Sequence, residues 1–69
     1  MNAFTLWLSA QVKREDPVGD LARDAGYDID FPTSGKLSDY RDHLTDVGAC
    51  RGALAALSRA WFEFQETGR

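Results

Sequence analysis

Apolar side chains recur at helical spacing in four separate stretches of this chain, and no two stretches alternate as paired strands would. In a helix, residues three and four positions apart share one face, so each stretch would present a single apolar stripe. The stretches cover about residues 3–13, 17–26, 37–47 and 50–67. We therefore predict an all-α fold, a compact bundle of four to five helices with short connections.

Each stripe holds four apolar residues. The stripes are Phe4, Trp7, Leu8 and Val12; Val18, Leu21, Ala22 and Ala25; Leu37, Tyr40, Leu44 and Val47; and Leu54, Leu57, Trp61 and Phe64. Leu6 lies off the first stripe, so we expect it to be exposed or to touch a partner. The last stretch is the longest and is rich in aromatic residues, which predicts a helix at the centre of the bundle.

Capping residues mark the expected ends of these helices. Asp16 followed by Pro17 predicts the start of the second helix, because Asp caps well and Pro suits the first helical position. Glycine favours the left-handed conformation that ends many helices. The other candidate caps are Asn2 for the first helix and Ser34 or Ser38 for the third, and the candidate terminators are Gly26, Gly48 and Gly68.

The connection over residues 27–36 carries alternating Tyr27, Ile29 and Phe31, the pattern of a short strand. No second stretch is available to pair with such a strand. Pro32 also biases Phe31 away from helical backbone angles. We therefore predict an ordered loop that is held in place by its aromatic side chains.

The chain has 69 residues, which is room for one domain spanning residues 1–69. A domain of this size buries only about 60% of the surface of its unfolded chain, so most large apolar residues are needed in the core. Cys50 is the single cysteine, so no internal disulfide can form. We interpret Cys50 as a small buried hydrophobic residue rather than a reactive thiol, which needs a basic environment.

We expect a cytoplasmic protein with no membrane association. The first residues lack the basic start and the apolar core of a secretory signal. No run approaches the roughly 18 apolar residues that a membrane span requires. A single cysteine also fits a reducing compartment.

The net charge of −3 is unevenly distributed along the chain. Residues 15–46 contain nine acidic and three basic side chains, whereas the two ends are basic. An acidic middle repels phosphate, which argues against broad nonspecific binding of nucleic acid. A local basic contact remains compatible with this distribution.

Several short motifs follow one another in an order that resembles the YozE SAM-like family of small bacterial proteins, where SAM stands for sterile alpha motif. The resemblance spans nearly the whole chain. Its motifs are Phe4-x-x-Trp7-Leu8, Asp16-Pro17, Asp20-Leu21-Ala22 with Asp24, Asp30-Phe31-Pro32, Leu44 and Ala60-Trp61-x-x-Phe64. His43 departs from the family pattern, which usually has an aromatic residue there.

The resemblance implies a helical bundle like that of sterile alpha motif domains. Those domains mediate protein association, and some of them bind nucleic acid. Members of this family have no established activity, and a shared fold does not supply one. The function must therefore be argued from the residues themselves.

His43 is the only histidine, and we find no catalytic group around it. No motif places a serine or cysteine nucleophile beside it. Asp39 and Asp46 lie one helical turn away and are the acids best placed to contact it. We interpret His43 as a surface histidine with acidic neighbours, and we predict that the chain is not an enzyme.

Three acids, Asp20, Asp24 and Asp28, are spaced as one helical face, which we call the acidic surface. Calcium prefers such oxygens, but the loop after Asp28 lacks the glycine and glutamate of an EF-hand. One cysteine and one histidine cannot make a zinc site, and the scattered glycines form no phosphate loop. We expect no metal and no cofactor, and we interpret these acids as a solvated face.

Phe62 falls outside the main stripe of its helix and lies next to Arg59. An exposed aromatic residue beside an arginine is common at protein interfaces. Arg51, Arg59 and Phe62 therefore form a candidate interaction surface for an unknown protein partner or for self-association. The alternative is that Phe62 packs under the N-terminal helix.

Nucleic-acid binding is the alternative function. Residues 43–61 have the helix–turn–helix order, in which the second helix would enter the major groove. Lys13 and Arg14 would add phosphate contacts if they lay nearby. The exposed face of that second helix would comprise Arg51, Ala55, Ser58, Arg59 and Phe62.

Overall fold

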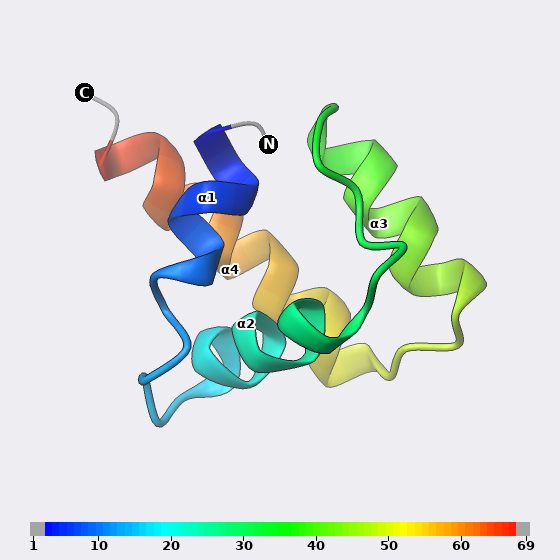
Figure 1. The fold of residues 1–69 in the computed structure, drawn as a ribbon, viewed down its shortest axis with the longest axis horizontal. Helices are drawn as coiled ribbons and strands as arrows, with labels where there is room; N and C mark the ends of the chain where they lie inside the picture. Colours follow the sequence, from blue (N-terminus) through cyan, green and yellow to red (C-terminus); the bar gives the residue numbers. More distant parts are fainter. Residues whose placement is uncertain (1–2, 68–69) are drawn as a thin grey trace.

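The computed structural model describes residues 3–67, which contain four helices and no strand (Figure 1). The helices are α1 (Ala3–Ser9), α2 (Pro17–Tyr27), α3 (Leu37–Asp46) and α4 (Arg51–Thr67). The all-α prediction is confirmed, and the described part of the chain has four helices rather than four to five. The proposed N-cap Asn2 and the terminator Gly68 lie outside the described residues.

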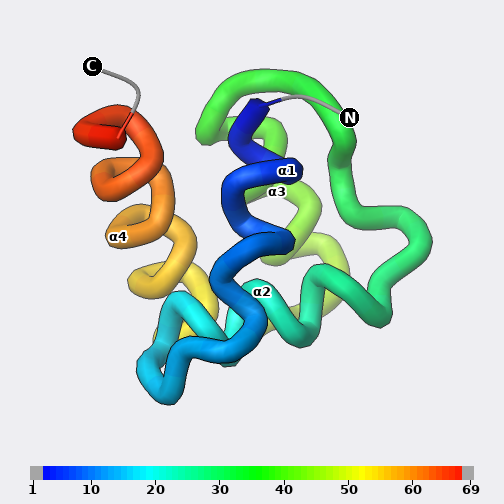
Figure 2. The backbone as a smooth tube through the Cα atoms, turned by 60° about the vertical axis from the view of Figure 1, so that its left-hand side comes forward, coloured from blue at the N-terminus to red at the C-terminus, as the bar shows by residue number. Residues whose placement is uncertain are grey.

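The helix α4 is the longest and packs against each of the other three (Figures 1 and 2). Its inner face includes Ala56, Leu57 and Ala60, which are all buried. The two small alanines let the neighbouring helices approach its backbone closely. The expected central position of this helix is therefore confirmed.

The first helix is shorter than predicted, because it ends at Ser9 rather than near residue 13. The amides of Ala10 and Gln11 donate to carbonyls three residues back, at 3.1 and 2.8 Å, which tightens the end of the helix. The chain then turns, and Val12 still packs against the core. Arg23 holds this turn by donating to the carbonyls of Val12 and Arg14, at 2.6 and 2.9 Å.

The start of α2 is as predicted, since the Asp16 carboxylate accepts a bond of 2.9 Å from the Gly19 amide. The predicted end at Gly26 is wrong. Gly26 lies inside the helix, which continues to Tyr27 and is capped by Asp28 in an extended conformation. No left-handed residue is needed there, because the Asp28 amide still bonds to the carbonyl of Ala25.

Neither Ser34 nor Ser38 caps α3. The N-cap is Lys36, whose amide donates to the Asp39 carboxylate at 2.7 Å. At the other end Gly48 has a φ of 78°, a left-handed angle that favours glycine, so the predicted terminator is confirmed. Val47 is 59% exposed instead of completing the third apolar stripe, because the helix has already ended at Asp46.

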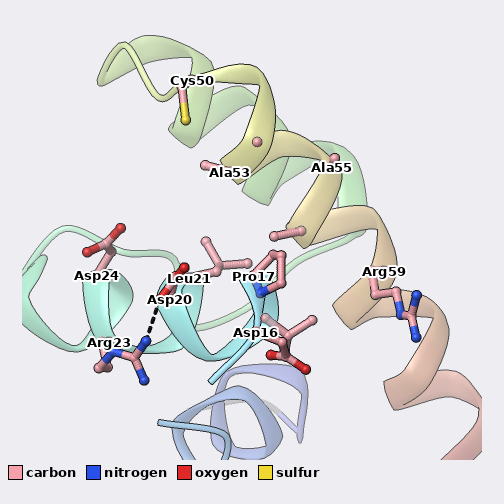
Figure 3. Close-up of a pocket in the computed structure, with 13 residues that line it drawn as sticks. Asp16, Pro17, Asp20, Leu21, Arg23, Asp24, Cys50, Ala53, Ala55 and Arg59 are labelled. Carbon is pink, nitrogen blue, oxygen red and sulfur yellow. Dashed lines mark hydrogen bonds and ion pairs between the residues drawn. The ribbon is translucent and has the colours of Figure 1, made fainter. Parts of the chain in front are cut away.

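Cys50 is exposed, contrary to the prediction of a buried residue. It lies in the short connection before α4, where Ala49 is the residue that packs against the core. The Cys50 side chain lines a groove between α2 and α4 (Figure 3). Among residues 3–67, no helix is long and apolar enough to cross a membrane.

The core is built from aromatic and aliphatic side chains of all four helices and of the connection between α2 and α3. That connection forms the predicted loop and passes beside α1 (Figure 2). Phe31 anchors it, whereas Tyr27 and Ile29 are almost fully exposed and do not. The buried residues are Phe4, Leu8, Val18, Leu21, Ala22, Phe31, Tyr40, Leu44, Ala56, Leu57 and Ala60.

Gly19 marks the closest approach of α2 to the preceding turn, and this makes a testable prediction. A Cβ atom there would lie 2.0 Å from the carbonyl oxygen of Arg14, and backbone cannot swing aside as a side chain can. We expect Gly19→Ala to destabilise the fold by about 1–3 kcal/mol, as overpacking does. Chemical denaturation followed by circular dichroism measures the change.

Gly26 provides the matched control, because it lies in the same helix with nothing within 4 Å of an added Cβ. Gly26→Ala should stabilise the protein by about 0.5–1 kcal/mol through the lower entropy of the unfolded chain. The proposed close approach is wrong if both variants change stability in the same direction.

Candidate interaction surface

Phe62 is 61% exposed on the outer face of α4. The alternative that it packs under the N-terminal helix is therefore wrong. Its neighbours Trp61 and Phe64 make that contact instead, with ring centroids 4.7 and 5.5 Å from the ring of Phe4. The large apolar side chain of Phe62 is thus left in contact with water.

Arg51 and Arg59 are exposed and lie on the same outer face of α4 as Phe62, since the helical rotation places the three positions within about 80° of one another. Arg59 is 73% exposed and donates from Nε to Glu63 at 3.1 Å. Arg51 is exposed at the first turn of the helix. The structure therefore brings the three residues of the predicted interaction surface onto one face, with one of the two arginines already neutralised in part by Glu63.

The acidic surface is divided. Asp20 and Asp24 lie on α2, whereas Asp28 follows the last helical residue in an extended conformation. The Asp28 carboxylate contacts Nε2 of His43 at 2.6 Å. The expectation that all three acids share one face is wrong for Asp28, because the helix ends before it.

The contact between Asp28 and His43 joins the end of α2 to α3. The predicted partners of His43, Asp39 and Asp46, are not its contacts, because its ring turns inward from the helix surface. That ring packs edge-on against Phe31, with centroids 5.8 Å apart. The hydrogen bond from His43 lowers the pKa of Asp28, more than burial raises it. His43 thus takes a packing role that an aromatic residue also could fill.

A groove of about 840 Å³ runs between α2 and the first half of α4 (Figure 3). Its sides include Asp20 and Asp24 from α2, and Arg59 lines it from α4. Its apolar lining includes Leu21 from α2 and Ala55 from α4, and the groove is open to solvent rather than enclosed. Two of the acids and one arginine of the candidate surfaces therefore border the same groove.

A second cluster was not predicted from the sequence. Arg14 donates to Asp16 at 2.6 Å and to both carboxylate oxygens of Glu63, at 2.8 and 3.2 Å. Paired contacts of this kind fix two elements in both distance and orientation. The cluster raises the pKa of Arg14 and lowers the pKa values of Glu63 and Asp16, in each case chiefly through these hydrogen bonds. Arg14 thus binds two carboxylates of its own chain.

No signal in the sequence could have paired Arg14 with Glu63, because the two residues are separated by 49 positions. The proposed use of Arg14 as a phosphate contact competes with these two carboxylates. Within the described part of the chain, no three His, Cys, Asp or Glu side chains are grouped so as to hold a metal ion.

The pair of Asp28 and His43 predicts a pH dependence of stability. A carboxyl whose pKa is lowered in the folded state stabilises that state above its ordinary pKa, and the contribution is lost as the pH falls through the folded-state value. Thermal unfolding between neutral and acid pH should therefore show a smaller loss of stability on acidification for Asp28→Asn than for the unmodified protein. Equal losses in the two proteins would contradict this role of Asp28.

His43→Phe is the companion variant. Phenylalanine keeps the edge-on packing against Phe31 and removes the hydrogen bond to Asp28. We expect it to fold and to show the same reduced acid sensitivity as Asp28→Asn. An unchanged acid sensitivity of this variant would assign the effect to other carboxyls.

Comparison with known proteins agrees with this architecture. The sequence pattern of the family described as YozE SAM-like fold matches residues 3–66, nearly the whole chain. No curated protein and no solved structure matched. The matched range includes α1, α2, α3, the loop held by Phe31 and nearly all of α4. The chain belongs to the YozE SAM-like family, as its motifs had indicated.

Proposed function

We propose that this chain is a noncatalytic protein-association module that uses the outer face of α4. The observation that carries the proposal is the exposure of Phe62, 61% of whose surface is open to water on a helix whose inner face is packed into the core. Removing such an aromatic surface from water on binding is favourable. Arg59, which lies one turn before Phe62, adds a group that can donate hydrogen bonds to a partner.

The groove that Arg59 lines supports the same proposal. It offers apolar area from alanines and charges of both signs at its edges, from Asp20, Asp24 and Arg59. Interfaces combine an apolar centre with a polar rim in this way. We propose the cytoplasm as the compartment, because a free cysteine without a disulfide partner suits reducing conditions.

Nucleic-acid binding through Arg51 and Arg59 stays a prediction that no observation favours. Glu63 already accepts a bond from Arg59, and Asp20 and Asp24 lie along the same groove. These carboxylates lower the local positive potential that phosphate binding requires. Protein association is the function that this arrangement of charges supports better.

Phe62→Ala tests the proposed function. Truncating an interface aromatic residue typically costs about 2 kcal/mol of binding, so we expect capture of partners to fall more than tenfold. The measurement is quantitative pull-down from lysate, together with chemical-shift changes of labelled protein on dilution. Since Phe62 is mostly exposed, its thermal unfolding midpoint should stay close to that of the unmodified protein.

Tyr27→Ala is the matched control, because Tyr27 is an even more exposed aromatic residue outside the interaction surface. It should leave capture unchanged. Duplex DNA at low salt forms the second arm of the experiment. Chemical-shift changes confined to Arg51 and Arg59 on adding DNA would support the alternative function. Equal capture of partners by Phe62→Ala and Tyr27→Ala would contradict the proposed association function.

A further inference from the structure

Six exposed residues form a stripe along the outer face of α4, which we call the outer stripe. The residues of the outer stripe are Arg51, Ala55, Ser58, Arg59, Phe62 and Glu66. Successive members are four, three, one, three and four positions apart, so the spacing reads the same in both directions. A helix with this spacing can face a reversed copy of itself with every member opposite another member.

The chemistry of the outer stripe matches under the same reversal. Arg51 would lie opposite Glu66, which is a pair of opposite charges. Ala55 would lie opposite Phe62, so the smallest side chain meets the largest. Ser58 and Arg59 would lie beside the centre of the stripe, each near its own counterpart, and the charge of Arg59 is already partly neutralised by Glu63 of the same copy. The stripe is therefore complementary to itself in charge and in size, and not only in spacing.

We propose that a second copy of this chain docks on the outer stripe, with the two α4 helices antiparallel about a two-fold axis near Ser58 and Arg59. This inference rests on the proposed association function and names the partner. Phe62 of each copy packs over Ala55 of the other, where Ala55 lines the groove beside α2 (Figure 3). Arg51 of each copy pairs with Glu66 of the other.

The unpartnered charges at the two ends of the outer stripe favour a second copy of this chain as the partner. Within residues 3–67, neither Arg51 nor Glu66 takes part in an ion pair. A two-fold dimer satisfies both charges in each copy, since the same patch is used on both sides. A head-to-tail contact between the arginines and the acidic surface would leave a free patch at each end and would continue into longer chains.

The area of the stripe sets the strength that we expect. An interface centred on one phenylalanine from each copy belongs to the small class that buries less than about 1,200 Å², which is typical of weak and transient complexes. Dimers should therefore form reversibly as the concentration rises from micromolar to millimolar. Sedimentation equilibrium over that range measures the association constant.

Exchanging the two end charges tests the register. Arg51→Glu places two like-charged pairs in the dimer, and Glu66→Arg does the same, so each variant alone should associate about tenfold more weakly than the unmodified protein. Mixing the two variants restores both attractive pairs. The mixture should therefore dimerise with nearly the original affinity, and a mixture that stays monomeric would overturn the proposal.

A disulfide scan tests the two-fold axis in a Cys50→Ser background. Ser58→Cys places two thiols almost opposite each other, so mild oxidation should give a covalent dimer. Ala55→Cys is the control, because its two thiols would lie about 10 Å apart along the helices. Efficient cross-linking of the control in preference to Ser58→Cys would contradict the antiparallel register.

The outcomes separate this inference from the proposed function. A protein that remains monomeric at millimolar concentration but captures another protein through Phe62 overturns the inference and keeps the function. Oligomers that grow beyond the dimer, and whose association Asp20→Asn and Asp24→Asn weaken, would show a head-to-tail contact. That result would also overturn the inference. A protein that neither self-associates nor captures a partner contradicts both.

Discussion

The packing of Phe4 is the contact on which the rest of the structure depends. Its ring meets Tyr40 of α3 at 4.9 Å, Trp61 of α4 at 4.7 Å and Phe64 of α4 at 5.5 Å between centroids. One buried side chain thus ties the short α1 to two longer helices. A helix of seven residues is too short to be stable alone, so α1 exists because this packing holds it.

The sequence predicted those features that depend on neighbours along the chain. Apolar spacing located all four helices, and Asp16 and Gly48 marked two of their ends. Contacts between distant residues escaped prediction, since nothing local links Arg14 with Glu63 or His43 with Asp28. Of the candidate site, the exposure of Phe62 was one of two interpretations left open, because a stripe does not tell how wide the buried face is. The groove could not be foreseen, as it arises only when α2 crosses α4.

The helix α4 separates structural from proposed binding roles by its two faces. Leu57 and Ala60 on the inner face are fully buried, whereas Phe62 on the outer face is not. Packing of the inner face holds the helix in place, so the outer face is already ordered before a partner binds. Binding therefore does not carry the entropic cost of ordering that surface. This division explains how so small a domain can keep an aromatic side chain out of its core.

Glu63 connects these two roles, because its carboxylate accepts bonds from Arg14 and from Arg59 at the same time. Arg14 belongs to the cluster with Asp16 and Glu63 that holds the turn before α2 against α4, and Arg59 belongs to the outer surface. A ligand that draws Arg59 away would leave the whole carboxylate to Arg14. Binding of a ligand to the outer face of α4 and the strength of the contact between Arg14 and Glu63 are therefore thermodynamically coupled. By reciprocity, anything that loosens the turn before α2 would alter the affinity of the outer face of α4.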